Sequence, residues 1–332
     1  MSRHAPPSTP NLLAGWLPAG SIALLFAVAG GVPGLLGPYE LEIAFRLMLY
    51  IALAEAWSLL AGYGGLVSLG SAAFVGIGAY VFTGVSNTVG LPIGLALTAG
   101  GIAGALLAAA ISPAMFRMRG LYFTVGTLAL GEALRLFMIN VPWFGGSRGL
   151  FLDADFPSRS ELYYWALGLL VFAEVIVTSY AQSRLSIALR AVRDDEDAAA
   201  QLGVRTVAVK LTVFAVASFL MAMAGGLQGY KLGAVEPYGM FGLPWSVDVL
   251  AMVMIGGLGQ RYAAVVGATF VTGLGEVLAD YPTVHIILTG VVLAAVVRFA
   301  PGGLCGLAVG LWRGRGNRLI RPWHQRRPEA LR

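Results

Sequence analysis

Long apolar runs separated by short polar stretches make up most of this chain. About 20 apolar residues are enough for a helix to cross the hydrocarbon core of a bilayer, so each long run predicts one membrane span. The predicted spans are residues 17–36, 42–61, 65–84, 92–114, 120–139, 163–181, 207–229, 263–280 and 284–300, with a shorter segment at 246–258. The pattern therefore predicts an all-α fold, a polytopic membrane helix bundle of about ten transmembrane segments, with eight to ten as the range.

The composition supports membrane insertion and removes several other classes of protein. With 58% hydrophobic and only 12% charged residues among 332, the chain has too little polar surface for a soluble globule of its size. The single cysteine, Cys305, excludes a disulfide within the chain, and the three histidines lack the spacing of metal ligands. The first apolar run ends in Gly34–Pro38 rather than in a small-residue cleavage site, so we interpret it as a retained span.

Basic residues fall mainly on one side of the predicted membrane. Ten spans place 17 of the 22 Lys and Arg on one face, three on the other and two within spans. Cytoplasmic loops carry the excess of positive charge, so both termini and the 182–206 loop are predicted to be cytoplasmic. The chain then divides into a cytoplasmic segment 1–16, a membrane domain 17–308 and a basic tail 309–332 held against anionic lipid. The net charge of +5 thus concerns orientation, and no nucleic-acid binding is expected.

One predicted loop, residues 183–204, is much more charged than its surroundings. It contains three Arg and a block of four acids between two apolar spans. Helix-forming residues run from 187 to 202 and Gly203 stands where a helix would end, so we predict one short amphipathic helix. Its apolar face would be formed by Ala188, Leu189, Val192, Ala198, Ala199 and Leu202. Such a helix is either a docking element for a soluble partner or a connector in water or on the lipid surface.

Two glycine-rich breaks, Gly62–Gly65 and Gly256–Gly259, fall within or beside predicted spans. Irregular backbone at membrane depth is tolerated only inside protein or beside a water-filled cavity. Both breaks are therefore expected inside the bundle. They either line a path for a solute or let neighbouring helices pack closely.

The predicted span 120–139 has one polar or small face. At 100° per residue its members fall within an arc of roughly 140°; they are Thr124, Thr127, Gly131, Glu132 and Arg135. This face could line the path of a polar solute, and Tyr122, Ser68 and Ser71 would then join it.

Charged residues within spans are expected to pair locally. Glu132 and Arg135 are three residues apart on one helix, and a structural ion pair is the alternative to a role in transport. Glu42 and Arg46, four residues apart near the outer end of their span, are expected to form a similar structural pair.

The sequence contains no constellation for bond-making chemistry. A Gly-x-x-x-x-Gly-Lys-Ser/Thr phosphate loop, a His-Glu-x-x-His motif and a nucleophile with a suitably spaced base are all missing. Energy for active transport would have to come from another chain or from an ion gradient, and the charged loop favours another chain. The longest outer loop, residues 140–162, is either a lid or docking surface for an external protein, or a connector.

Five blocks of sequence occur in order between about residues 40 and 308. They are Gly62–Tyr80; Arg119–Phe123 with Thr127–Ala129; Ala188–Arg193 with Glu196, Ala198, Ala199 and Gly203; Gly256–Gly259 with Gly267–Ala268; and Phe299–Leu304 with Gly306–Leu307. Together they resemble the LivM-type permeases, the membrane subunits of branched-chain amino acid ABC importers. Three positions depart from the family: Ser71 replaces a frequent His, Ser186–Ile187 replaces Gly-Arg, and Ala263–Ala264 replaces Gly-Pro.

The resemblance implies a heteromeric ABC importer of type II in the bacterial inner membrane. Its other parts would be a second, LivH-like permease, two ATP-binding subunits and an extracytoplasmic substrate-binding protein. This chain would bind no cofactor and catalyse no reaction, because ATP would be used by the partner subunits. Residues 188–204 would be the coupling helix seated on an ATPase subunit.

The resemblance also implies roles for individual residues. The coupling contact would involve Ala188, Leu189, Arg190, Arg193, Asp195, Glu196, Ala198, Ala199, Leu202 and Gly203. The translocation path would involve Ser68, Gly70, Ser71, Tyr80, Tyr122, Thr124, Thr127 and Glu132. The expected solutes are Leu, Ile, Val or related amino acids. The alternatives are urea or short amides within the same family, an ion-coupled secondary transporter, and a membrane-embedded enzyme.

Overall fold

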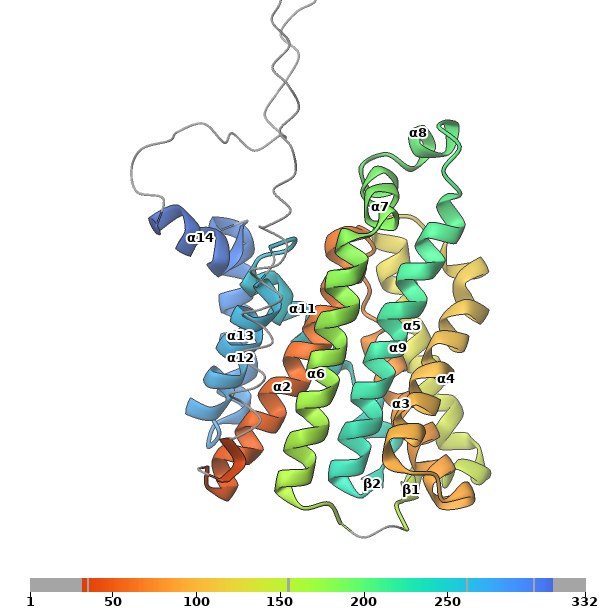
Figure 1. Cartoon of the computed structure of the whole chain (residues 1–332), viewed down its shortest axis with the longest axis vertical. Helices are drawn as coiled ribbons and strands as arrows, with labels where there is room; N and C mark the ends of the chain where they lie inside the picture. The colour runs from red at the N-terminus through yellow and green to blue at the C-terminus, as the bar shows by residue number, and fades with distance from the viewer. Residues whose placement is uncertain (1–31, 35, 154–155, 261, 301, 313–332) are drawn as a thin grey trace, which may run out of the picture.

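The computed structural model describes residues 32–312, except 35, 154–155, 261 and 301, and most of this part is helical (Figure 1). The α-helices are α2 (Pro38–Ser58), α3 (Ser71–Val89), α4 (Ile93–Met115), α5 (Leu121–Asn140), α6 (Arg159–Gln182), α7 (Arg184–Asp194), α8 (Glu196–Gln201), α9 (Thr206–Leu232), α10 (Pro237–Met240), α11 (Leu243–Gly256), α12 (Ala263–Val277), α13 (Pro282–Phe299) and α14 (Gly303–Trp312). The short turns are η1 (Val32–Gly34), the π-helical η2 (Leu59–Tyr63), η3 (Pro142–Phe144) and η4 (Gly146–Arg148). Strands β1 (Leu150–Phe151) and β2 (Ala234–Val235) pair antiparallel.

Among the described residues, seven helices are long and apolar enough to cross a membrane. They are Pro38–Tyr63, Ser71–Val89, Ile93–Met115, Leu121–Asn140, Arg159–Gln182, Thr206–Leu232 and Pro237–Gly256. Two further apolar helices, Ala263–Val277 and Ile287–Phe299, are shorter. The predicted all-α membrane bundle is confirmed. The segment predicted at 246–258 is longer than expected, because α10 and α11 follow each other from Pro237 to Gly256.

Both ends of the chain lie outside the described residues. These ends include the predicted cytoplasmic segment 1–16, most of the expected first span 17–36 and the basic tail from residue 313. The number of ten spans and the cytoplasmic location of both termini therefore stay predictions. Helix α14 reaches Trp312, within the stretch predicted as the tail.

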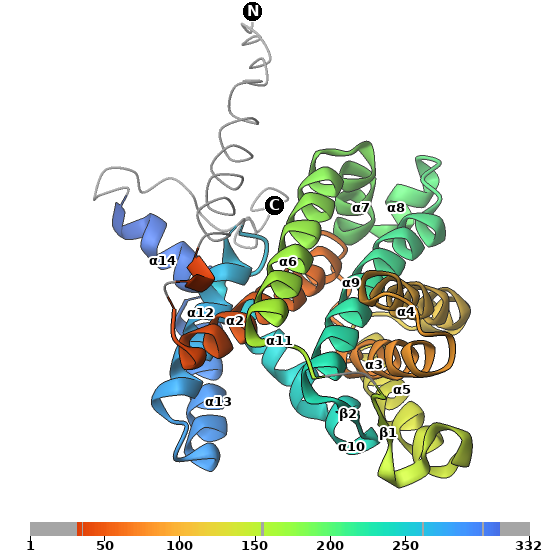
Figure 2. The ribbon, with the colours of Figure 1, turned by 60° about the horizontal axis from the view of Figure 1, so that its bottom comes forward.

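Helix α2 lies between two groups of helices (Figures 1 and 2). On one side it packs against α6 and α9, and α3 and α4 pack on α9; on the other side it packs against α11 and α12. Its C-terminal half is buried, including the whole side chain of Trp57. Helices α7 and α8 project at one end of the bundle, and β1 and β2 lie at the other end (Figure 1).

Glycines bring α3 and α9 into backbone contact. A Cβ atom at Gly78 of α3 would lie 1.9 Å from the carbonyl oxygen of Ala222 on α9. A Cβ atom at Gly225 of α9 would lie 2.0 Å from the carbonyl oxygen of Val75 on α3. Lipid tails are as apolar as the helix surfaces, so close van der Waals packing of this kind holds membrane helices together.

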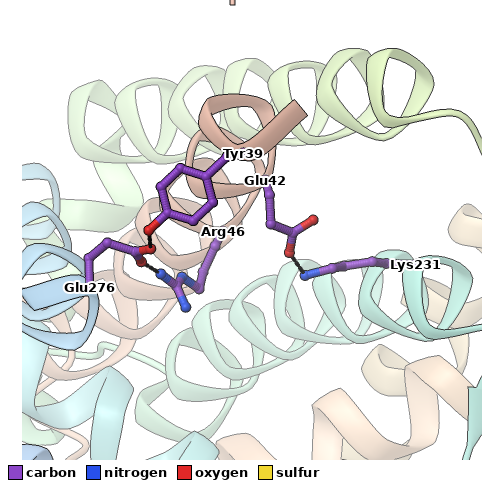
Figure 3. Close-up of polar contacts among 5 residues, drawn as sticks. All are labelled: Tyr39, Glu42, Arg46, Lys231 and Glu276. Carbon is purple, nitrogen blue, oxygen red and sulfur yellow. Dashed lines mark hydrogen bonds and ion pairs between the residues drawn. The ribbon is translucent and has the colours of Figure 1, made fainter. Parts of the chain in front are cut away.

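Two ion pairs connect the N-terminal half of α2 to helices on both sides (Figure 3). Arg46 pairs with Glu276 of α12, which also accepts a hydrogen bond from the hydroxyl of Tyr39. Glu42 pairs with Lys231 of α9. The expected pair between Glu42 and Arg46 is therefore wrong, because each of these side chains has an oppositely charged partner on another helix.

Candidate functional site

A non-helical segment, residues 64–70, separates α2 from α3. The π-helical turn η2 ends at Tyr63, Gly65 has a φ angle of +65°, and α3 begins only at Ser71. The span predicted to start at residue 65 therefore starts too early. Glycine tolerates this left-handed conformation, which ends the helix, and the segment that follows forms its hydrogen bonds with other helices.

Two threonines of α5 hold the segment through its backbone. The hydroxyl of Thr127 accepts a hydrogen bond from the N–H of Leu69 at 3.1 Å. The hydroxyl of Thr124 donates to the carbonyl oxygen of Val67 at 2.7 Å. These contacts satisfy backbone groups that a continuous helix would have paired internally. The polar face predicted on this helix is therefore turned, in part, toward the segment.

Buried groups of α2 and α11 bind the segment and the first turn of α3 that follows it. The indole N–H of Trp57 donates to the carbonyl oxygen of Ser68 at 2.8 Å, and the hydroxyl of Ser68 accepts from the N–H of Gly70 at 3.0 Å. On α11, the hydroxyl of Ser246 accepts from the N–H of Ala72 at 3.1 Å. Sequence reasoning missed Trp57 and Ser246, because nothing in an apolar run indicates which distant backbone group a single polar atom will meet.

The structure brings five of the predicted path residues together around this segment. They are Ser68, Gly70, Ser71, Thr124 and Thr127. The other three lie apart. Tyr122 is 78% exposed and lines a separate cavity on α5, Tyr80 packs in a small cluster with Phe241, and Glu132 lies further along α5.

Two of the predicted path residues on α3 carry buried hydroxyls without a hydrogen-bond partner among the described residues. Ser71 is 1% exposed and Tyr80 is 2% exposed. An unpaired buried hydroxyl costs free energy unless water or another polar molecule pairs with it. These two hydroxyls are therefore places on α3 where water or a polar solute could gain a hydrogen bond.

Glu132 and Arg135 form the ion pair expected from their spacing. The Nε atom of Arg135 donates to Glu132 at 2.9 Å, and the guanidinium carbon lies 4.9 Å from the centre of the Tyr238 ring. The Arg135 side chain is 19% exposed, whereas that of Glu132 is 54% exposed. The structural interpretation of the pair is thus supported, and a role for Glu132 in transport stays a prediction.

The charged loop contains two helices and not the single helix predicted. Asp195 separates α7 from α8 with an extended backbone (φ −156°, ψ 106°), and its carboxylate accepts a hydrogen bond from the N–H of Ala198 at 2.9 Å. Aspartate is a preferred N-cap, so it starts a new helix here. The predicted helix end is confirmed: Gly203 has a φ of +86°, and the N–H groups of Gly203 and Val204 bond back to α8.

The predicted apolar face of this loop is correct for α7 and only partly correct for α8. Leu189, Val192 and Ala199 are buried and Ala188 is half-buried. Ala198 is exposed and Leu202 is 84% exposed, so both were wrongly placed on this face. The reason is the new start at Asp195 together with the turn at Gly203, after which Val204 packs against the core in place of Leu202.

Four basic side chains attach the two short helices to the membrane bundle. On α7, Arg193 donates to the carbonyl oxygen of Gly62 at 2.8 Å, and Arg190 lies 5.7 Å from the centre of the Tyr63 ring. On α8, Glu196 pairs with the buried Lys210 of α9 at 2.5 Å. Asp197 pairs with Arg119, between α4 and α5, at 3.1 Å. The hydrogen bond from Arg119 holds the pKa of Asp197 below its usual value.

A cavity of about 670 Å³ lies between the charged loop and the non-helical segment. Its wall includes Gly65 and Val67 from the segment, Arg119 and Thr124 beside or on α5, and Arg193 and the acids of the loop. The cavity therefore joins the segment to the end of the bundle where α7 and α8 project.

The second glycine break lies only partly inside the bundle, because Gly256 and Gly257 are buried whereas Leu258 and Gly259 are exposed. A Cβ atom at Gly62 would lie 3.6 Å from the backbone nitrogen of Gly259, so the two breaks adjoin each other. Gly257 has a φ of +118°, and a Cβ atom there would lie 2.2 Å from the carbonyl oxygen of Gly302. At this second break the glycines thus serve close packing, one of the two predicted roles.

Comparison with known proteins gives one family, and the relatives include two kinds of permease. A family model described as a branched-chain amino acid transport system permease component matches residues 39–312. The high-affinity branched-chain amino acid transport system permease protein LivM of Salmonella typhimurium is 27% identical, over 84% of this chain and 73% of its own. The LivM protein of Escherichia coli K12 is 26% identical, over 85% and 74%.

A second kind of relative is named for the import of a different solute. The autoinducer 2 import system permease protein LsrC of Escherichia coli O9:H4 is 26% identical, over 91% of both chains. No solved structure matches the chain with comparable significance.

Proposed function

Because the chain belongs to the family of branched-chain amino acid transport system permease components, we propose that it is the permease subunit of an ATP-driven importer for branched-chain amino acids. It is a multi-pass protein of the inner membrane. The observation that carries the proposal is the family match over residues 39–312, together with a helix pair, α7 and α8, that projects from one end of the bundle (Figure 1). The partners would be a second permease, two ATP-binding subunits and an extracytoplasmic binding protein.

The solute is proposed to be leucine, isoleucine, valine or a related amino acid. The LivM relatives support this choice by their names, and the LsrC relatives support a second candidate, a small polar solute of the autoinducer type. The segment 64–70 itself contains no ionisable side chain, whereas Arg119, Arg193 and the acids of the charged loop line the cavity beside it. We assign selection of the solute to the separate binding protein, as the resemblance to the family implies.

The exposed part of the helix pair is the proposed seat for the ATP-binding subunit. Ala198 is exposed on α8, Leu202 is exposed directly after it, and Ile187 is 70% exposed on α7. An exposed large apolar side chain at the tip of a charged loop is suited to a hydrophobic pocket on a protein partner. By contrast, Glu196 is bound to Lys210 within the chain and is less available to a partner.

Uptake by the reconstituted complex tests the proposal. The chain is co-expressed with its second permease and ATP-binding subunits, placed in liposomes with the binding protein outside, and supplied with labelled leucine, urea or autoinducer 2. We expect leucine uptake that requires ATP inside. Uptake that continues without ATP and stops when an ionophore dissipates the ion gradient would contradict the proposal and favour a secondary transporter.

Leu202→Asp tests the seat of the ATPase. A charge in an apolar interface should reduce co-purification of the ATP-binding subunit by about ten-fold or more. Val89→Asp, at a position 65% exposed at the other end of the bundle, is the matched control and should leave co-purification unchanged. Normal co-purification with Leu202→Asp would place the ATPase elsewhere.

A further inference from the structure

Two arginines of α7 face the π-helical turn that ends α2. Arg193 donates to the carbonyl oxygen of Gly62, and Arg190, one turn earlier, stacks over Tyr63. Both were expected to contact the ATPase, yet both are turned toward the bundle. The turn they hold is the one that leads directly into the segment 64–70.

The fit between α7 and this turn is close. A Cβ atom at Gly65 would lie 2.5 Å from the Cγ atom of Arg193, so the arginine stem lies directly on the backbone where the segment begins. A shift of α7 therefore cannot leave Gly65 in place without breaking this contact. Chains of packed side chains and hydrogen bonds such as this one can carry energetic coupling between distant sites.

Hydrogen bonds connect the segment to α5. Val67 and Leu69 bond to Thr124 and Thr127, so any displacement of residues 64–70 acts on the first turns of α5. The other short helix reaches the same place, because Asp197 of α8 pairs with Arg119 just before α5 begins. Helices α7 and α8, which Asp195 separates, are therefore both connected to α5, α7 through the segment 64–70 and α8 through Arg119.

We propose that Arg193, supported by Arg190, is a positioning residue that transmits movement of α7 to the segment 64–70, and is not a contact for the ATPase. This inference rests on the proposed function, because the movement would come from an ATP-binding subunit seated on the loop. ATP-driven displacement of α7 would pull on the carbonyl of Gly62 and open or close the cavity beside Val67.

The test separates assembly from coupling. Arg193→Gln removes the charge and the long donor, Arg193→Lys retains a donor, and Arg184→Gln is the control. The Arg184 side chain is also exposed on α7, but it forms no hydrogen bond, ion pair or ring contact with the described residues. Each complex is assayed for co-purified ATPase, for ATP hydrolysis and for solute moved per ATP.

A cysteine reporter adds a direct measure of the segment. Val67 is 37% exposed in the cavity, so Val67→Cys in a Cys305→Ser background can be labelled with a water-soluble maleimide in nanodiscs. In the otherwise unchanged complex, the labelling rate should differ between the ATP-bound and nucleotide-free states. With Arg193→Gln this difference should disappear.

We expect Arg193→Gln to retain co-purification and hydrolysis within about two-fold while solute moved per ATP falls about ten-fold. Arg193→Lys should recover part of the loss, and Arg184→Gln should match the parent. Normal transport by Arg193→Gln would overturn the inference, as would loss of transport that only follows loss of co-purified ATPase.

Two further outcomes are distinguishable. If Arg193→Gln does not fold, Arg190→Gln decides, because it removes only the contact of an exposed side chain with Tyr63 of the π-helical turn. A reduced labelling difference in Arg190→Gln supports the inference, and an unchanged difference overturns it. If the parent chain itself never co-purifies an ATP-binding subunit, it is the proposed function that fails.

Discussion

Arg46 of α2 pairs with Glu276 of α12, although Glu42 stands one turn away on its own helix. Glu42 pairs instead with Lys231 of α9 (Figure 3). The four side chains are between 20% and 38% exposed, so neither pair is fully screened by water. Helix α2 is therefore connected by charge to the helices on either side of it.

Reversing the charge at position 46 should weaken the contact between α2 and α12. Arg46→Glu places two carboxylates together, and we expect the free energy of unfolding to fall by about 1–3 kcal/mol, between the values for exposed and buried pairs. Combining it with Glu276→Arg should recover part of the loss. Thermal unfolding in detergent measures both effects, and strictly additive losses in the double variant would argue against the pair.

Thr127 should be required as a hydrogen-bond acceptor and not for its shape. Thr127→Val keeps the volume but leaves the partly buried N–H of Leu69 without its partner, which should cost about 1–3 kcal/mol. Thr127→Ser retains the hydroxyl and should cost less. The measurement is the midpoint of thermal unfolding, with maleimide labelling of Val67→Cys as a local probe. Equal midpoints for the Val and Ser variants would show that the hydroxyl is unimportant.

Local pattern was sufficient to predict the seven long apolar helices of the described residues and insufficient to predict their partners. Apolar runs indicated the spans because crossing a bilayer is a requirement on each segment alone. The pair Glu42–Arg46 was inferred from spacing on one helix, but the actual partners stand 189 and 230 residues away. A charged side chain at membrane depth can pair with an oppositely charged group on any helix of the bundle. The order of residues along one helix does not reveal that partner.

The two errors at helix ends have different causes. The break at Asp195 had a readable signal, since an aspartate followed by acids in the next turn favours the start of a helix. The late start of α3 at Ser71 had a weaker one: Gly64 and Gly65 indicated a break, but its length depends on Thr124 and Thr127 from α5. Of the candidate site, the sequence therefore indicated Ser68, Ser71, Thr124 and Thr127. It did not indicate Trp57 or Ser246.

The ion pair between Arg119 and Asp197 should persist in mild acid and weaken in high salt. Arg119 lowers the pKa of Asp197, so the stabilisation is present above the ordinary aspartate pKa and is lost only as pH falls through the lowered value. Lowering the pH from about 7.5 to 5.5 should thus leave the contact intact, since an ordinary aspartate titrates near 4. The two side chains are 68% and 71% exposed, so about 0.5 M salt should weaken it.

Spin labels on α8 and on the α4–α5 connection report this contact as a distance distribution. Asp197→Asn should broaden the distribution at every pH, and it serves as the reference for a broken contact. Broadening of the unsubstituted protein with a midpoint at or above about pH 4, the ordinary aspartate value, would mean that the pKa of Asp197 is not lowered.

Gly78 should be far less tolerant of a side chain than Gly84 on the same helix. A methyl group at Gly78 would overlap the backbone of Ala222, so α3 and α9 would have to separate along their contact. Overpacking of this kind costs about 1–3 kcal/mol, and more where the obstacle is backbone and cannot change rotamer. We therefore expect Gly78→Ala to lower the midpoint of thermal unfolding markedly and to reduce the yield of folded protein from detergent.

Gly84→Ala supplies the matched control, because it makes the same chemical change on the same helix with nothing within 4 Å of the added atom. Alanine is the better helix former by about 1 kcal/mol, so this variant should be neutral or slightly more stable. The opposite signs expected for two identical substitutions separate packing from helix propensity. If both variants were destabilised equally, flexibility of α3 and not its contact with α9 would explain its glycines.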